Sequence, residues 1–107
     1  MLEWRKLGKL FDPKDLQRET WMKDFAQSPS VIFFETYIRV YFTSRPQPTA
    51  DGQYRSYMTY IDVDRKNPLR ILHVCEEPIL SLGGYGTFDE FGTTPISVIR
   101  DENEIRV

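Results

Sequence analysis

The chain has 107 residues, of which 40% are hydrophobic and 14% aromatic, a length and composition typical of one globular domain. Its 14 basic and 16 acidic residues are well mixed and give a formal net charge of -2. That balance argues against nucleic acid and anionic lipid as partners. The first residues, "MLEWRKLGKLF", lack the apolar core of a signal peptide. No apolar run approaches the roughly 18 residues of a membrane span, so we expect a cytoplasmic protein.

The N-terminal part predicts a strand followed by a short helix. Trp4–Phe11 alternates imperfectly between apolar and polar residues and favours a short strand. Asp12-Pro13 suits a helix start, with aspartate as the N-cap and proline at the first helical position. The following residues carry no strong apolar stripe, so we expect one or two helical turns that end before Ser28-Pro29.

The segment "SVIFFETYIRVYFTSR" gives the best β signal in the chain. Val31–Phe34 is a continuous apolar run, as in a strand buried on both faces, and Glu35-Thr36 predicts a tight reversal. In Tyr37–Ser44, alternation places residues 37, 39, 41 and 43 on one face and residues 38, 40 and 42 on the other. This pattern predicts a β-hairpin with one apolar face.

Four further strands are predicted, separated by segments rich in turn-forming residues. Pro46–Gln53, with two prolines and an Asp-Gly pair, predicts a loop, and residues 65–69 predict a turn ahead of the fourth strand. The expected strands are Tyr54–Asp62, Arg70–Cys75, Pro95–Asp101 and Glu104–Val107. The total of about seven strands with almost no helix is an all-β pattern.

The end of the chain resembles its middle. Pro95–Ile99 matches Pro29–Phe33, and Glu104–Val107 matches Tyr37–Val40, with a period of about 66 to 67 residues. Four-stranded units repeated along a chain are typical of propeller blades. We therefore predict one antiparallel four-stranded blade-like sheet, a partial second blade and a short N-terminal helical turn. The predicted core is Phe33, Ile38, Val40, Phe42, Ile61, Ile71, Val74, Ile96 and Val98.

The segments "WRKLGKLFDP", "WMKDFAQSPSV", "IRVYFTSR", "YIDVDRKNPLRIL", "EEPIL" and "GTFDEFGTTPISVI", in this order, carry a family resemblance. Together they resemble the N-terminal third of five-bladed β-propeller proteins related to glycoside hydrolases, including the β-fructosidase and arabinanase-like groups. The resemblance implies that residues 1–107 form a single domain of roughly one and a half to two blades. It also implies carboxylates on the innermost strands around a central funnel, the groups that glycosidic cleavage requires.

The catalytic pattern is incomplete in this sequence. Ser28 and Thr94 hold the places where the resemblance implies an aspartate before the proline of an inner strand, and the general acid would lie in a third blade. Asp24 and Asp89 are the remaining catalytic candidates. A solvated turn residue is the favoured interpretation of Asp24, and Asp89 is equally interpretable as a residue that accepts hydrogen bonds within its own turn.

Three further side chains are candidates for substrate binding. Trp21 could stack on a sugar ring, or could be a core aromatic. Arg45 could bind a hydroxyl or carboxylate, or form a strand-end ion pair. Glu90 could lean into the funnel together with Asp89. The glycine-rich segment around them, Gly83–Thr94, is expected to connect the two blades, first as structure and second as a ligand-facing loop.

No cofactor and no metal site are expected. The lone cysteine, Cys75, cannot form an internal disulfide and favours a small buried residue, and His73 has no second ligand in register. The functional hypotheses are a fragment of a propeller glycoside hydrolase without a complete site, a carbohydrate-binding or protein-interaction module, and a glycosidase completed by oligomerisation. The C-terminal strand edge predicts a homo-oligomer, most simply a dimer, and carbohydrate is the expected ligand.

Overall fold

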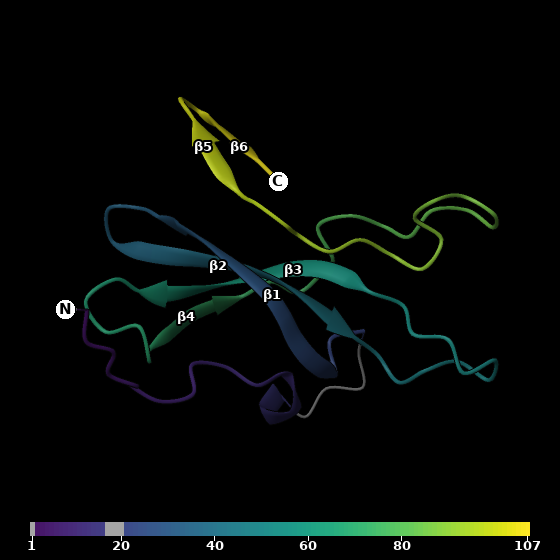
Figure 1. The fold of residues 1–107 in the computed structure, drawn as a ribbon, viewed down its shortest axis with the longest axis horizontal. Helices are drawn as coiled ribbons and strands as arrows, with labels where there is room; N and C mark the ends of the chain where they lie inside the picture. The colour runs from purple at the N-terminus through teal and green to yellow at the C-terminus, as the bar shows by residue number, and fades with distance from the viewer. Residues whose placement is uncertain (1, 17–20) are drawn as a thin grey trace.

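The structure is a computed structural model that describes residues 2–16 and 21–107. It is nearly all β, with no α-helix in those ranges and one 3-10 helix, η1 (Pro13–Leu16). Four strands form an antiparallel sheet in the order β1 (Asp24–Phe33), β2 (Tyr37–Arg45), β3 (Tyr57–Asp64) and β4 (Ile71–Val74). A separate two-stranded sheet pairs β5 (Ile99–Asp101) with β6 (Glu104–Arg106) (Figure 1). The predicted fold class is confirmed.

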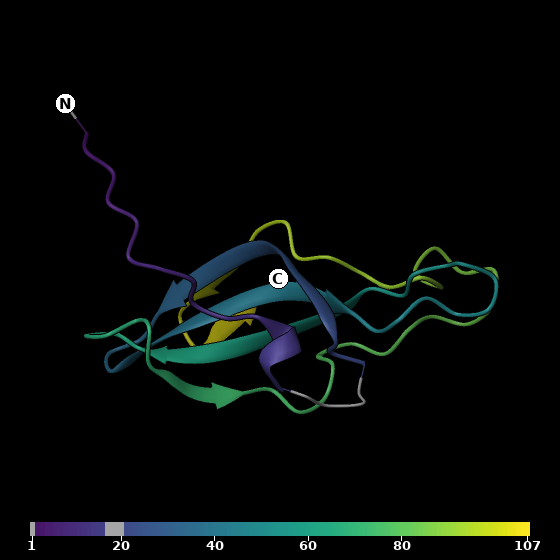
Figure 2. The same ribbon diagram turned by 90° about the horizontal axis from the view of Figure 1, so that it is seen from below.

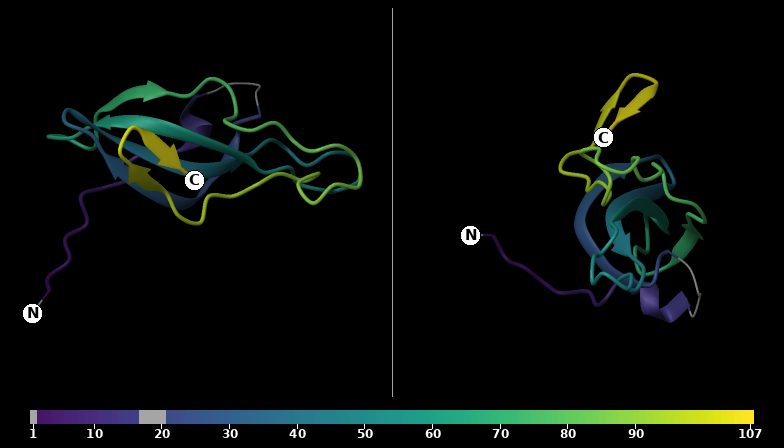
Figure 3. Two further views of the ribbon diagram at one scale, coloured as in Figure 1. Left: turned by 90° about the horizontal axis from the view of Figure 1, so that it is seen from above. Right: turned by 90° about the vertical axis from the view of Figure 1, so that its right-hand side faces the viewer.

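The N-terminal segment covers one face of the curved four-stranded sheet, and the β5–β6 hairpin stands away from the sheet on its other side (Figure 3). Asp12 caps η1, because its carboxylate accepts a hydrogen bond from the backbone N–H of Lys14 at 3.0 Å. The short helical turn is thereby confirmed, and the possible second turn, over residues 17–20, lies outside the described residues.

The predicted strand Trp4–Phe11 is wrong. These residues are irregular, and the chain runs away from the sheet toward its N-terminus, with Trp4 94% exposed (Figure 2). A strand needs a partner for its backbone N–H and C=O groups, and no strand of the described ranges pairs with this segment. The described ranges therefore contain six strands instead of about seven.

Other strand bounds also differ from the prediction. Ser28 and Pro29 lie inside β1, which begins at Asp24, so they do not end a helix. The strand β3 begins at Tyr57 rather than Tyr54 and ends at Asp64, and β5 begins at Ile99 rather than Pro95. The reversals at 35–36 and 65–69 are as predicted. The single apolar face predicted for β2 is wrong at its C-terminal end, because Tyr41 and Thr43 on one face are buried as fully as Phe42 on the other.

The core lies between the sheet and the N-terminal segment. Its buried members are Met22, Phe42, Ile61 and Val63, with Ile38, Val40 and Val74 among the half-buried residues packed against them. Of the predicted core, Phe33, Ile71 and Ile96 are wrong, because their side chains are 56%, 40% and 93% exposed, and Val98 is only half-buried outside this cluster.

Candidate functional site

The strand β1 begins with two bulges. In its pairing with β2, Asp24 lies opposite Arg45, Gln27 opposite Thr43 and Ser30 opposite Tyr41. Each step from one pair to the next covers three residues on β1 but two on β2, so β1 contains one extra residue per step. Phe25 (φ 65°) and Ser28 (φ 53°) adopt the left-handed conformation at these steps. Bulges re-aim side chains, and such backbone strain concentrates at functional sites. The start of β1 is therefore a candidate functional site.

The carboxylate of Asp24 is fixed by neighbouring side chains at this end of the sheet. Its Oδ2 accepts a hydrogen bond from Nε2 of Gln47 at 2.7 Å. Its Oδ1 lies 3.6 Å from Nζ of Lys14, and the side chain is 16% exposed. The hydroxyl of Ser44 donates to the backbone carbonyl of Asp24 at 3.0 Å. Side-chain and backbone contacts thus fix Asp24 from three directions.

Arg45 lies opposite Asp24 in the register and next to two aromatic rings that also contact each other. Its guanidinium carbon is 5.8 Å from the ring centroid of Phe25 and 5.4 Å from that of Tyr54. The two rings meet edge to face at 6.0 Å and remain 45% and 41% exposed. Nε of Arg45 donates to the hydroxyl of Ser56 at 3.1 Å. We call Asp24, Phe25, Arg45, Gln47 and Tyr54 the β1-start site.

Trp21 contacts the body of the protein rather than the β1-start site. Its Nε1 donates to the backbone carbonyl of Glu76 at 3.2 Å, and its ring lies 5.7 Å from that of Tyr57. It is half-buried and packs against the core. The structure therefore places Trp21 as the core aromatic that the sequence left as one alternative.

The glycine-rich segment is attached to the site through Ser56. Gly92 forms a parallel bridge with Ser56. The N–H of Ser56 donates to the carbonyl of Phe91 at 2.8 Å, and the N–H of Thr93 donates to the carbonyl of Ser56 at 3.3 Å. Gly92 has φ 104°, and a side chain there would overlap the Ser56 carbonyl. This close approach requires glycine.

The acidic pair of the segment is engaged within its own loop. The carbonyl of Asp89 accepts from the N–H groups of Gly83 and Gly92 at 3.1 and 3.0 Å, and a side chain at Gly83 would overlap the Asp89 carboxylate. Oε2 of Glu90 accepts from the N–H of Gly86 at 2.8 Å. Both residues are half-buried. They hold the loop in shape and are grouped apart from Asp24 and Arg45.

The remaining sequence candidates show no catalytic arrangement. Ser28 is exposed in the second bulge, and Thr94 is exposed beside Pro95. The thiol of Cys75 donates to the carbonyl of Glu77 at 3.0 Å, and the ring of His73 lies 6.0 Å from that of Tyr60. Across residues 2–16 and 21–107 no group of three or more potential metal ligands occurs.

Sequence reasoning missed a charged pair on the face of the sheet opposite the core. Two nitrogens of Arg39 donate to the two carboxylate oxygens of Asp62 at 2.8 and 3.0 Å, and the guanidinium carbon lies 3.9 Å from the Tyr60 ring centroid. The hydrogen bonds to Asp62 raise the pKa of Arg39 above its ordinary value. The signal was available, because both residues occupy the same face of adjacent strands. The pair is a structural link.

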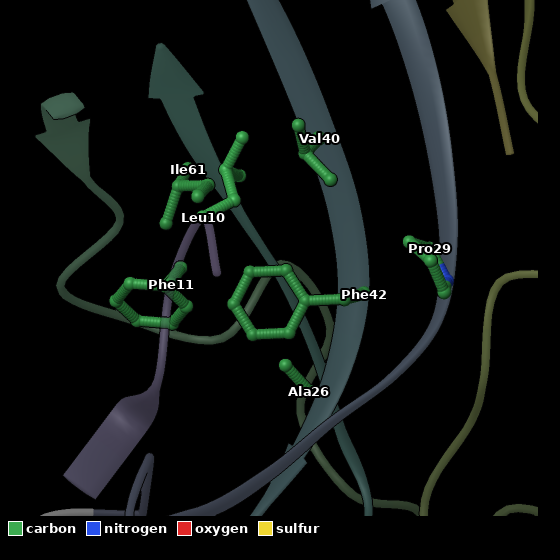
Figure 4. Close-up of a pocket in the computed structure, with 7 residues that line it drawn as sticks. All are labelled: Leu10, Phe11, Ala26, Pro29, Val40, Phe42 and Ile61. Atoms are coloured by element: carbon green, nitrogen blue, oxygen red, sulfur yellow. The ribbon is translucent and has the colours of Figure 1, made fainter. Parts of the chain in front are cut away.

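The structure also has an apolar pocket of about 180 Å³ on the core face of the sheet (Figure 4). Leu10 and Phe11 of the N-terminal segment close it against the side chains of Ala26, Pro29, Val40, Phe42 and Ile61. The rings of Phe11 and Phe42 lie 5.5 Å apart. With no polar side chain in its lining, this pocket has no group for acid–base chemistry.

Among the described residues, no helix has the length and apolar character to cross a membrane. No protein-family model matches the chain, and no solved structure matches it. Two proteins of Mycobacterium tuberculosis are similar to it: the uncharacterized protein MT1551 of strain CDC 1551 and the uncharacterized protein Rv1502 of strain H37Rv. Each is 36% identical over 100 residues, which cover 92% of this chain. The chain spans 31% of the length of these relatives.

Proposed function

We propose that the chain forms the first part of a carbohydrate-binding β-propeller and carries no complete glycoside-hydrolase site of its own. The observation that carries the proposal is the β1-start site. There a held carboxylate, an arginine and two half-exposed aromatic rings share one end of the sheet. Ligand sites combine aromatic surface with a few placed polar groups, and this set offers ring faces for a sugar and charged groups for its hydroxyls.

The fold and the comparisons support the propeller part of the proposal. The four-stranded antiparallel sheet has β1 at its edge, as the innermost strand of a blade would be. The hairpin β5–β6 follows after a long crossing; the sequence match to the first hairpin covers β6 and reaches β5 only at Ile99. The similar mycobacterial proteins are about three times as long as this chain, which is the proportion expected between a propeller and its first third.

The absence of a complete catalytic site follows from the chemistry of glycosidic cleavage. That reaction uses two carboxyl groups on either side of one bond. Asp24 supplies one candidate, and its carboxylate binds Gln47. Of the second candidates, Glu90 accepts a hydrogen bond from the backbone of its own loop, and the Asp89 carboxylate lies against Gly83 of the same loop. A glycosidase completed by oligomerisation would need another chain to bring a second carboxylate to Asp24.

Titration calorimetry with neutral sugars tests the proposal. The sugars are cello-, xylo-, arabino- and fructo-oligosaccharides and their monosaccharides. We expect binding that Asp24→Asn and Tyr54→Ala each weaken by about fivefold or more. Phe33→Ala is the matched control, because Phe33 is a 56% exposed aromatic at the other end of β1. Failure of every sugar to bind would contradict the proposal. Turnover of an aryl glycoside that Asp24→Asn abolishes would contradict its non-catalytic part.

The second candidate function is a self-associating interaction module, favoured by the β5–β6 sheet. In the described ranges β6 pairs only with β5. An antiparallel partner strand identical to β6 and centred on Ile105 would place Glu104 opposite Arg106 in both directions, a favourable cross-strand charge pair. Multi-angle light scattering at micromolar concentration tests it. A dimer that Ile105→Lys dissociates is expected, and a 12.7 kDa monomer would contradict it.

A further inference from the structure

Two loops extend beyond the end of the sheet where the β1-start site lies. They are residues 46–56 and the segment around the glycine-rich stretch; both point the same way, and Figure 1 shows their tips apart from each other (Figures 1 and 3). The bridge between Ser56 and Gly92 joins them. Because Ser56 also accepts the hydrogen bond from Arg45, the same residue attaches the second loop and orients the arginine of the site.

The glycine-rich loop turns its acids inward and its aromatic rings outward. Asp89 and Glu90 are half-buried and contact their own backbone. Tyr85 and Phe88 are each 98% exposed, although folding commonly covers such large apolar side chains. Thr87, between them, donates its hydroxyl to the carbonyl of Gly84 at 2.6 Å and fixes the turn. Within this chain the loop leaves both rings exposed.

A further aromatic ring connects this loop tip with the β1-start site. Phe91 is 43% exposed, next to the bridging Gly92. The guanidinium carbon of Arg55 lies 4.8 Å from its ring centroid. Exposed rings thus occur at the β1-start site, next to the bridge between Ser56 and Gly92, and in the glycine-rich loop.

The segment that carries the loop tip is acidic, whereas the basic residues Arg45 and Arg55 lie at the base of the loop. Residues 71–99 contain four acidic residues and no lysine or arginine, a formal charge of 0 − 4 = −4. An anionic membrane or a nucleic acid requires basic residues at the contact surface. An uncharged ligand with stackable faces meets no such requirement. Rings separated by glycine and threonine also differ from a continuous apolar patch for a protein partner.

From these observations we infer that Tyr85 and Phe88 form a second binding region for a neutral oligosaccharide that reaches from the β1-start site to the loop tip. The inference rests on the proposed function and goes beyond it by assigning the ligand length and two binding residues. A monosaccharide contacts the β1-start site alone. A longer chain also stacks on the loop rings, so its affinity rises with length.

The experiment compares sugars of one to six units from the four neutral series by titration calorimetry, on the native chain and on Tyr85→Ala/Phe88→Ala. We expect the native chain to bind the longer sugars about tenfold or more tighter than monosaccharides. The double variant is expected to lose that gain and to keep its monosaccharide affinity. Trp4→Ala is the matched control, because Trp4 is 94% exposed in the N-terminal segment and is expected to leave both affinities unchanged.

The outcomes separate the two proposals. Affinity that is independent of sugar length, or that the double variant leaves unchanged, overturns the loop inference while the β1-start site stands. Binding of none of the sugars overturns the proposed function and the inference with it. Preferential binding of the native chain to phosphatidylserine vesicles or to acidic oligosaccharides over every neutral sugar overturns the choice of an uncharged ligand.

Discussion

Replacing Gly92 with alanine is expected to detach the glycine-rich loop from Ser56. A Cβ at this position would overlap the Ser56 carbonyl oxygen and lie 2.6 Å from its carbon and 2.9 Å from the Ser56 nitrogen. The obstacle is backbone, so no rotamer change relieves it. Residue 92 also has φ 104°, a region that costs an L-residue about 1–2 kcal/mol.

The size of the effect follows from what the loop loses when it detaches. Two backbone hydrogen bonds join the segments, at 2.8 and 3.3 Å, and each contributes about 0.5–1.5 kcal/mol net. Detachment also relieves the overlap, so the loss is limited to about 1–3 kcal/mol. Hydrogen exchange measures it directly at the amides of Ser56 and Thr93, which donate these bonds. Their exchange should accelerate by roughly 5- to 150-fold.

Two other glycines of the loop serve as controls. Gly84 has open space around it and an ordinary φ, so Gly84→Ala should leave exchange unchanged or slow it slightly. Gly86 also has open space but φ 81°, so its alanine variant should show the conformational cost alone, about 1–2 kcal/mol. If Gly92→Ala preserved the protection of both amides as Gly84→Ala does, the bridge assigned here would be wrong.

Three further predictions concern the sheet. Phe42→Ala should lower the free energy of unfolding by about 3–5 kcal/mol in urea titrations, because Phe42 is 2% exposed, whereas the same change at the 56% exposed Phe33 should cost far less; equal losses would contradict the burial assigned to these two residues. Asp62→Ala should lower the free energy of unfolding by about 2–3 kcal/mol, since it leaves the partly buried guanidinium of Arg39 without its partner. Adding Arg39→Met should recover part of that loss, and a double variant no more stable than Asp62→Ala alone would refute this reason. Burial raises the pKa of Tyr60 above its ordinary value of 10.0. Its contribution to stability is therefore complete below pH 10 and is lost as the pH rises through the folded-state pKa, so Tyr60→Phe should flatten the alkaline decline in chemical-denaturation midpoints, and an unchanged decline would exclude Tyr60 as its source.

The hairpin and its faces could be predicted from the sequence because their signals are local. Alternation along Tyr37–Arg45 fixes which side chains share a face, and the reversal at Glu35-Thr36 joins it to the preceding strand. The structure agrees, with Phe42 in the core and Arg39 on the opposite face. Period and turn chemistry suffice for such elements.

Elements that depend on distant partners could not be predicted in the same way. Trp4–Phe11 alternates like a strand, yet no strand lies beside it. Val31–Phe34 is apolar throughout, so its sequence could not show that Ile32 would be 6% exposed and Phe33 56%. Ile32 pairs with Arg39 and is buried on the face opposite the core, whereas Phe33 pairs with Ile38 on the core face and stays exposed.

The candidate site was predictable as a set of residue types and not as a geometry. Asp24 and Arg45 were candidates from the sequence, but their direct pairing requires two bulges. The left-handed residues at those bulges are Phe25 and Ser28 rather than glycines, so no composition signal announced them. The role of Tyr54 as the second ring on Arg45 also depends on the long loop before β3.

The bulged start of β1 has a second consequence, for the behaviour of the protein at high concentration. β1 is an edge strand of the four-stranded sheet, and a straight edge offers a template on which other chains can add strands and aggregate. Two extra residues within Asp24–Ser30 break the regular spacing of its free N–H and C=O groups, so an incoming strand cannot keep register with it. The pairing of β5 with β6 has no such interruption. Intermolecular strand addition should therefore begin at the C-terminal hairpin, and β1 should remain free of it.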